Sequence, residues 1–297
     1  MLIIGVIILS LQDSLIKYMA SETSFWQLQF IRSIGNIILL FGIARITNGI
    51  NILFPRKWKP VYLRALTMTT CMFCFFAASP QLSFAQMAAG LYTFPIFVSL
   101  LAIIFLKERI GLWRFFALIL GSFGALLILE PWSENFKFLQ ILPVMAGFFF
   151  ACNIILIRKY CRQESVMSLT LAVGVMFFIS ASLGILFFEL IFQNNFLRGN
   201  SPFVFIGWPS LTLIVFVFCL SCSILNISGN ILLAKAYQTA ESSWLAPMDY
   251  SYLVFAAIWG KIFFGVWPTL LNLIGMFFIA FSGILIAFRE QRKLKSN

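Results

Sequence analysis

About ten stretches of roughly twenty apolar residues, joined by short polar gaps, dominate this 297-residue sequence. A helix needs about 20 mostly apolar residues to cross the hydrocarbon core of a bilayer. The spans must be helical, because an open strand cannot satisfy its backbone hydrogen bonds in lipid. The predicted fold class is an all-α polytopic membrane protein with about ten transmembrane helices. The predicted spans are 1–19, 25–44, 61–79, 84–106, 112–130, 138–157, 167–191, 209–233, 243–263 and 268–288.

The composition excludes a soluble globular protein. Apolar residues make up 61% of the chain and charged residues only 10%, whereas about 25% charged residues is typical of soluble domains. A net charge of +11 could suggest nucleic-acid binding, but the basic residues are not gathered in one patch. We therefore expect membrane lipid as a partner, and no nucleic acid.

Lysine and arginine cluster in every second gap between the apolar stretches. Basic residues that flank membrane spans stay on the cytoplasmic side, so the alternation orients the spans. It predicts a multi-pass protein of the inner (plasma) membrane of a bacterium, with both termini in the cytoplasm. The clusters are Arg45, Arg56, Lys57, Lys59 and Arg64; Lys107, Arg109 and Arg114; Arg158, Lys159 and Arg162; Lys235; and Arg289, Arg292, Lys293 and Lys295.

The two halves of the sequence share a motif. Gly-Leu-Trp at 111–113 precedes Gly121 with the same spacing as Gly-Val-Trp at 265–267 precedes Gly275. We predict two five-helix repeats, one over residues 1–130 and one over 138–288. Because five is odd, the second repeat enters the membrane from the opposite side, which is the inverted-topology arrangement of many secondary transporters. Chance recurrence of small residues and tryptophan is the alternative. Residues 289–297 are predicted to form a basic cytoplasmic tail.

Several segments resemble the EamA domain of the drug/metabolite transporter superfamily. In the first half they are Phe94-Pro95-Ile96-Phe97 through Phe105-Leu106-Lys107-Glu108-Arg109-Ile110, and the small residues from Ala117 to Gly124. Residues 245–250 and 264–268 are similar to the second copy, although Val266 stands where that copy usually has an acid. Residues 13–17 and 29–32 resemble the start of such proteins, so the resemblance covers nearly the whole chain.

The resemblance implies a secondary active transporter that moves a small organic metabolite by alternating access. It allows amino-acid-like solutes, nucleoside-like solutes such as S-adenosylmethionine, and cationic amphipathic solutes, with a coupling proton or ion as a second partner. The alternative is a membrane-embedded enzyme acting on a lipid or isoprenoid substrate. Such enzymes generally need clustered carboxylates or histidines, whereas the acids here are isolated and the chain has no histidine. A receptor without catalytic activity is weaker still, because no soluble sensing domain is evident.

Three ionisable residues, Asp13, Arg32 and Asp249, lie well inside apolar segments. Each would cost about 2.5–3.5 kcal/mol if it faced lipid unpaired, so all three should face the interior. Asp13 and Arg32 fall at similar depths in a helix that rises about 1.5 Å per residue, and we predict an ion pair between them, with Lys17 one turn outward. This group could either join the helices structurally or gate the transport path. Asp249 could either contact the solute or form hydrogen bonds that pack the helices.

Two prolines in apolar segments, Pro95 and Pro247, predict bent or broken helices, since proline leaves a backbone carbonyl without its donor. Large rings with polar groups lie nearby and suit a flat or cationic solute. We include them as candidates for the substrate path: Tyr92, Phe94, Trp244, Tyr250 and Tyr252.

Glu108 lies between Lys107 and Arg109 and is predicted to be an interfacial gate residue. Cys71 and Cys74, like Cys219 and Cys222, have metal-ligand spacing. We interpret them as apolar packing residues, because no histidine accompanies them. No catalytic residue, metal or cofactor is predicted.

Overall fold

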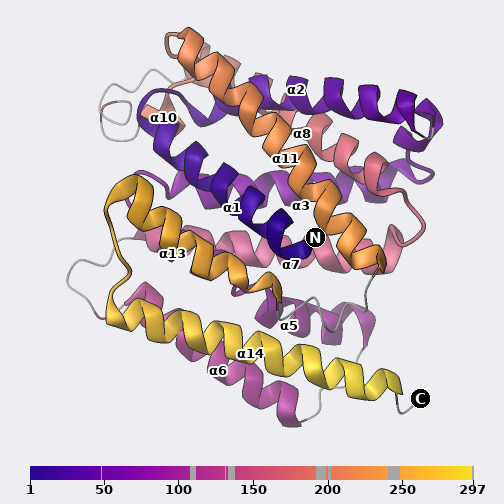
Figure 1. Ribbon diagram of the computed structural model, residues 1–297, viewed down its shortest axis with the longest axis vertical. Helices are drawn as coiled ribbons and strands as arrows, with labels where there is room; N and C mark the ends of the chain where they lie inside the picture. The colour runs from indigo at the N-terminus through magenta and orange to yellow at the C-terminus, as the bar shows by residue number, and fades with distance from the viewer. Residues whose placement is uncertain are drawn as a thin grey trace.

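The computed structural model describes residues 1–47, 49–107, 112–130, 132, 138–191, 199, 202–239 and 248–295. Within these ranges the chain is helical and has no strand, which confirms the predicted all-α class. Figure 1 shows the helices side by side in one bundle. They are α1 (Leu2–Tyr18), α2 (Phe25–Ile46), α3 (Trp58–Ala77), α4 (Phe84–Leu91), α5 (Phe94–Leu106), α6 (Leu112–Leu129), α7 (Leu142–Tyr160), α8 (Val166–Leu186), α10 (Pro202–Phe205), α11 (Leu213–Thr239), α13 (Ser251–Phe264) and α14 (Leu270–Lys295).

Seven helical segments in the described ranges are long and apolar enough to cross a membrane. Three shorter apolar helices, Phe115–Leu129, Ser251–Phe264 and Leu270–Leu285, coincide with the predicted fifth, ninth and tenth spans. Several boundaries differ from expectation by a few residues. Helix α3 already begins at Trp58, and α14 continues through Lys295, so most of the predicted tail is helical.

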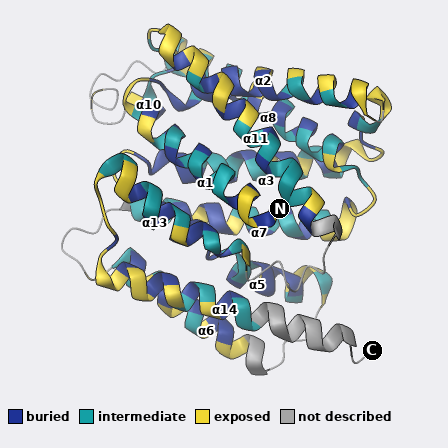
Figure 2. Cartoon of the chain, viewed as in Figure 1, coloured by how far each residue is buried: buried dark blue, intermediate teal, exposed yellow. Residues whose placement is uncertain are grey.

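The outward faces of the bundle are apolar, as a lipid environment requires. Large hydrophobic side chains are exposed on several helices, for example Ile104 on α5, Leu213 on α11 and Leu270 on α14. Figure 2 shows exposed residues along the outer faces and buried residues between the helices. Exposed apolar surface of this extent is unusual for a soluble monomer and is consistent with a multi-span membrane protein.

Predicted span 84–106 is broken in the structure. Helix α4 begins with a capping box in which the side chains of Ser83 and Gln86 bond each other's backbone N–H. It ends at Leu91, and α5 starts at Phe94 with Pro95 in its first turn, a position where proline loses no helix hydrogen bond. The broken helix predicted from Pro95 is confirmed.

The break packs directly on the start of α7. A Cβ on Gly90 would lie 2.4 Å from the Cβ of Pro143, and one on Gly147 would lie 2.7 Å from the Thr93 hydroxyl. Two glycines, one on each side, therefore permit a backbone approach that any larger side chain would prevent. This contact fixes the position of Tyr92, the first residue of the break.

The main contacts between helices join the two halves of the sequence. Helix α3 packs on α7 and α8, and α11 packs on α1 and α2. Helices α4 and α5 pack on α7, while α13 packs on α1. The remaining main contacts join α2 to α8, α4 to α13, and α6 to α14.

Helices α6 and α14 form a pair at one edge of the bundle (Figure 1). Their backbones approach closely, since a Cβ on Gly124 would lie 2.7 Å from the Gly275 carbonyl oxygen and the converse distance is also 2.7 Å. In Figure 1, α1 starts at the N label and runs to the left, whereas α14 starts at the left and ends near the C label. The first and last helices are thus antiparallel.

Candidate solute-binding cavity

A cavity of about 250 Å³ lies in the middle of the bundle. Its described lining comes from α1, α2, α3, α4, α5, α7, α8, α11 and α13, but not from α6 or α14. The wall is mixed, with apolar and aromatic surface around a few polar groups, which is the usual make-up of a small-molecule site. The polar lining residues are Gln12, Asp13, Arg32, Asn36, Arg64, Tyr92, Thr170, Asn226, Asn230, Asp249 and Tyr252.

Asp13 lines the cavity, but its predicted direct ion pair with Arg32 is not formed. The Tyr252 hydroxyl donates to Asp13 Oδ2 at 2.7 Å, and the Gln12 side-chain amide donates to Oδ1 at 2.8 Å. Arg32 lines the same cavity, but no salt bridge joins it to Asp13. The predicted partner was wrong, because two neutral donors already occupy the carboxylate oxygens.

Arg32 is 4% exposed and lines the cavity from α2. Its guanidinium lies over the Phe177 ring, 5.5 Å from the centroid. Within the described part of the chain, this side chain has no hydrogen bond to another residue. The backbone carbonyl of Arg32 accepts a hydrogen bond from Ser223 on α11, which anchors α2 at this level.

A line of amides connects Asp13 to the far wall of the cavity. Asn226 on α11 donates to Gln12 Oε1 at 2.9 Å, and the Asn36 amide on α2 approaches Asn226 Oδ1 at 3.4 Å. Asn230 donates to the Asn226 backbone carbonyl. These contacts tie α1, α2 and α11 together, and sequence reasoning missed them. The signal was available, since Asn226 and Asn230 are four residues apart in an apolar span and therefore share one helix face.

Part of the cavity lining is aromatic, and we call this part the aromatic wall. Tyr92 and Tyr252 are stacked, with ring centroids 5.2 Å apart. Phe94 contacts both Tyr92 and Phe150, at 5.7 and 4.9 Å between centroids. The Tyr92 hydroxyl donates to the Asp249 backbone carbonyl at 3.0 Å. The helix break therefore positions a ring cluster and, through Tyr92, the segment that carries Asp249.

Asp249 and Arg64 complete the charged lining. The Asp249 carboxylate has no hydrogen bond or ion pair with any residue the structure describes. Arg64 donates to the Leu169 carbonyl at 2.9 Å, while its Nε is buried without a partner among those residues. Arg64 was assigned from the sequence to a cytoplasmic gap. It lies instead inside α3 (Trp58–Ala77), within the predicted span 61–79.

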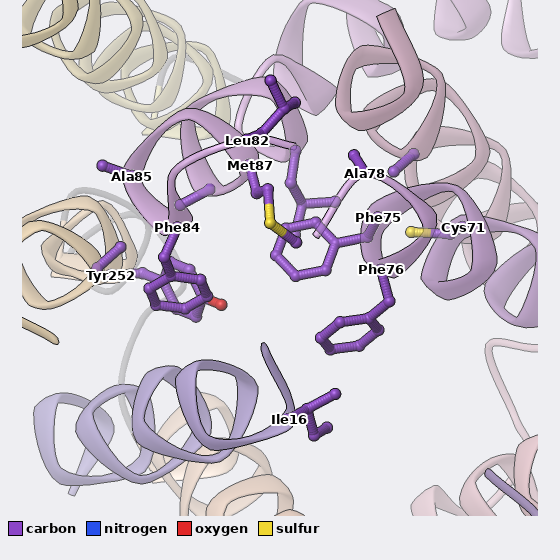
Figure 3. Packing of buried hydrophobic residues seen from close by; sticks show 14 of the residues in the cluster. Ile16, Cys71, Phe75, Phe76, Ala78, Leu82, Phe84, Ala85, Met87 and Tyr252 are labelled. Atoms are coloured by element: carbon purple, nitrogen blue, oxygen red, sulfur yellow. The ribbon is translucent and has the colours of Figure 1, made fainter. Parts of the chain in front are cut away.

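One end of the cavity is closed by a packed apolar layer. Ile16, Phe75, Phe76 and Phe84 are 0–1% exposed, and they lie beyond Asp13 on α1, at the end of α3 and at the start of α4. Figure 3 shows Phe84 beside Tyr252, and Ile16 facing Phe76. We call Ile16, Phe75, Phe76 and Phe84 the closed layer.

Lys17 reinforces this end. Its ammonium group donates to the carbonyl oxygens of Ser79 and Leu82 in the α3–α4 connection and lies 5.2 Å from the centroid of the Phe264 ring. Lys17 thus lies outside the cavity, although the sequence placed it with Asp13. The segment from 202 to 209 adds a further lid, because Trp26 and Gln27 at the start of α2 donate to the carbonyls of Val204 and Pro209.

The opposite end is lined differently. Val6, Arg64, Thr170 and Leu233 come from the ends at which α1, α3 and α8 begin and α11 finishes. Except for Val6, these lining residues are half-buried. The cavity therefore extends from the closed layer toward the side on which the chain starts.

Six predicted site residues are brought together in the cavity: Asp13, Arg32, Tyr92, Phe94, Asp249 and Tyr252. Pro95 and Tyr250 lie behind it, with the buried Tyr250 ring 5.5 Å from that of Tyr92. Trp244, Pro247 and Glu108 fall outside the described residues. The cysteines Cys71, Cys74, Cys219 and Cys222 are buried free thiols. No group of three or more metal-ligating side chains occurs in the described ranges.

A bundle of apolar helices around a solute-sized, partly charged cavity is typical of a multi-span membrane protein with a small-molecule site. Residues 1–130 match the model of the EamA-like transporter family. The resemblance stated from the sequence is confirmed by this match. A solved crystal structure shares the fold, with a TM-score of 0.53 and 14% identity over 97% of this chain and 95% of its own.

The chain is also similar to named bacterial transporters. A riboflavin transporter of Vibrio cholerae is 26% identical over 70% of this chain and 64% of its own length, so less than two thirds of that protein is matched. An S-adenosylmethionine uptake transporter of Rickettsia bellii is 25% identical over 97% and 92%. A pseudopaline exporter of Pseudomonas aeruginosa is 22% identical over 90% and 87%. The matched family and these relatives are named as transporters, and none of them is named as a lipid-modifying enzyme.

Proposed function

We propose that this protein is a secondary active transporter that moves a small organic metabolite through the central cavity by alternating access. The observation that supports it is the asymmetry of the cavity, which is sealed at one end by the closed layer and lined at the other by half-buried residues. A binding site that is open to one side only is what alternating access requires of each of its states. The similarity to metabolite transporters agrees with this function.

The inverted repeat of residues 1–130 and 138–288 is part of the proposal. Exchanging each helix of the first half for its counterpart in the second converts the α3–α7 contact into α11–α1, and α3–α8 into α11–α2. The same exchange converts the contact of α4 with α7 into that of α13 with α1. The spacing that relates Gly121 to Gly275 also relates Ile128 to Ser282. The contact of Gly121 with Ser282 therefore corresponds to the contact of Gly275 with Ile128. These correspondences support two repeats related by a pseudo-twofold axis.

The basic clusters orient the transporter in the proposal. Lys57, Lys59, Arg158, Lys159 and Arg162 lie at the α2–α3 and α7–α8 connections, on the side toward which the cavity extends. Under the positive-inside rule this side is cytoplasmic. The state described here then faces inward, in a bacterial inner membrane, with both termini in the cytoplasm.

Uptake by proteoliposomes tests the function. We expect purified protein to accumulate at least one of labelled S-adenosylmethionine, riboflavin or a neutral amino acid, tested one by one. Asp249→Asn should lower the rate at least about tenfold, because a group in the wall of the site is lost. Glu164→Gln is the matched control, since Glu164 accepts hydrogen bonds from the backbone N–H groups of Arg56 and Lys57 outside the cavity.

Two results would contradict the proposal. One is the absence of accumulation of every solute by folded wild-type protein. The other is an equal rate for the wild type and the Asp249→Asn variant. Reporter tags that placed the two termini on opposite faces of the membrane would refute the proposed topology, independently of transport.

A further inference from the structure

We infer that the cavity binds a small amino-acid-like zwitterion, with Arg32 holding its carboxylate and Asp249 holding its ammonium group. This inference rests on the proposed function and names the substrate class of that site. It comes from the hydrogen bonds of the four charged side chains in the wall, which divide into two kinds.

Asp13 and Arg64 already have protein partners. Both carboxylate oxygens of Asp13 accept hydrogen bonds, from Tyr252 and Gln12. Arg64 donates to a carbonyl of α8 through one terminal nitrogen, although its Nε has no partner among the described residues. Arg32 and Asp249 differ, because neither side chain has a hydrogen bond or ion pair with any other described residue, although both line the cavity. The first pair therefore builds the wall, and the second pair is available to a solute.

Arg32 is suited to a carboxylate. A guanidinium has five N–H donors in a fixed plane and can hold both oxygens of a carboxylate at once. The Phe177 ring lies 5.5 Å from the guanidinium and covers one face, so the planar edge remains for a ligand. Asp13 also lines the cavity, but both of its carboxylate oxygens accept hydrogen bonds from other residues.

Asp249 is suited to an ammonium group. The hydrogen bond from the Tyr92 hydroxyl to its backbone carbonyl fixes this residue relative to the aromatic wall. The stacked rings of Tyr92 and Tyr252 add surfaces that attract a cation. Phe94 and Phe150 provide apolar surface for the remainder of the solute.

The balance of charge argues for both groups on one solute. A solute with only a positive charge would leave Arg32 buried without a hydrogen-bonding partner. A solute with only a negative charge would leave Asp249 without a partner. Leaving a buried charge unpaired is costly. The volume of about 250 Å³ is below the roughly 300–1,000 Å³ typical of drug-sized ligand sites, which favours a solute of amino-acid size.

Six probes test the assignment by thermal shift on the purified full-length protein, since a ligand that binds the folded state raises the Tm. L-Phenylalanine is compared with 2-phenylethylamine, which lacks the carboxylate, and with 3-phenylpropionate, which lacks the ammonium group. L-Methionine is compared in the same way with 3-(methylthio)propylamine and 4-(methylthio)butanoate. We expect at least one amino acid to bind about tenfold or more tightly than both of its analogues, because each lost charged contact removes about one order of magnitude.

Variants then assign each end of the zwitterion. Arg32→Gln should abolish the preference for the amino acid over its amine, and Asp249→Asn should abolish the preference over its acid. Arg32→Lys keeps the charge and should retain part of the first preference, which covers a failure of Arg32→Gln to fold. Arg45→Gln, at the exposed end of the same helix, and Glu164→Gln are the matched controls and should change neither ratio.

The outcomes separate this inference from the proposed function. An amine or acid that binds as tightly as its amino acid, or an amino-acid preference that survives both cavity variants, overturns the inference. If none of the six probes binds, the amino-acid-like assignment is wrong. The proposed function is then decided by the uptake of riboflavin or S-adenosylmethionine, which does not depend on these probes.

Discussion

The two ends of the central cavity differ in the way a protein core differs from a binding site. At the closed end, Ile16, Phe75, Phe76 and Phe84 are 0–1% exposed, and the Lys17 ammonium group is tied to backbone carbonyls. At the other end, Arg64, Thr170 and Leu233 are half-buried lining residues of one cavity. The stability of this conformation should therefore depend on packing at the closed end. The access of solute and water to the cavity should depend on the other end.

The largest difference between the two ends should be in stability. Phe76→Ala should lower the free energy of unfolding by about 3–5 kcal/mol, because it empties a fully packed position. Phe150→Ala on the cavity wall should cost less than about 2 kcal/mol, since that ring already borders open space. Unfolding of both variants in mixed detergent micelles measures this. Equal losses would show that the two rings are packed alike.

Chemical accessibility should differ nearly as much. In a variant whose six cysteines are replaced by alanine or serine and which still transports, Thr170→Cys should react with a water-soluble maleimide about 100-fold faster than Ile16→Cys. A buried site reacts only through local opening, and a factor of 100 corresponds to about 2.7 kcal/mol. Comparable rates at both positions would contradict the closed layer.

The hydrogen bond from Tyr252 to Asp13 joins the closed layer to the cavity, and its loss should have an intermediate effect. Tyr252→Phe removes the donor 2.7 Å from Asp13 Oδ2 and should destabilise the protein by about 1.5–3 kcal/mol, as expected for a hydrogen bond to a charged group. Tyr18→Phe is the control, because Tyr18 is 54% exposed. A Tyr252→Phe variant as stable as the control would mean that another donor replaces this hydroxyl.

The smallest effect should come from Lys17. Lys17→Met removes the bonds to the carbonyls of Ser79 and Leu82 and should raise the reactivity of Ile16→Cys about tenfold, equivalent to about 1.4 kcal/mol. Lys261→Met, in the exposed last turn of α13, should leave that reactivity unchanged. If both lysine variants behave alike, Lys17 does not hold the closed end together.

Much of the fold could be predicted because it depends on local chemistry. Hydropathy located the apolar helices, and Pro95 located the break between α4 and α5. The site was harder, since depth along a helix is set by sequence position but the choice of partner is not. Asp13 and Arg32 do reach the same cavity. However, the donor that Asp13 binds is Tyr252, which is 239 residues away in the sequence, and only the packing of α13 on α1 brings it there.

Polar residues near helix ends were the other difficulty. Arg64 was counted with a basic loop cluster although the predicted span 61–79 already contained it. Lys17 was grouped with Asp13 because they are one turn apart on α1. Asn226 and Asn230 were overlooked, since an amide in an apolar span is as often a packing group as a site group. Their spacing could have indicated a shared face, but the partner helices could not be inferred from it.

The α6–α14 pair, with its glycine crossing, contributes no residue to the described part of the cavity wall. A deep mutational scan should for this reason separate into two patterns. Changes at Gly124 and Gly275 should reduce the amount of folded protein for every solute alike, whereas changes at cavity positions should alter the ranking of solutes while the protein level stays constant. Evolution of a new specificity can then proceed in one set of helices without disturbing the other.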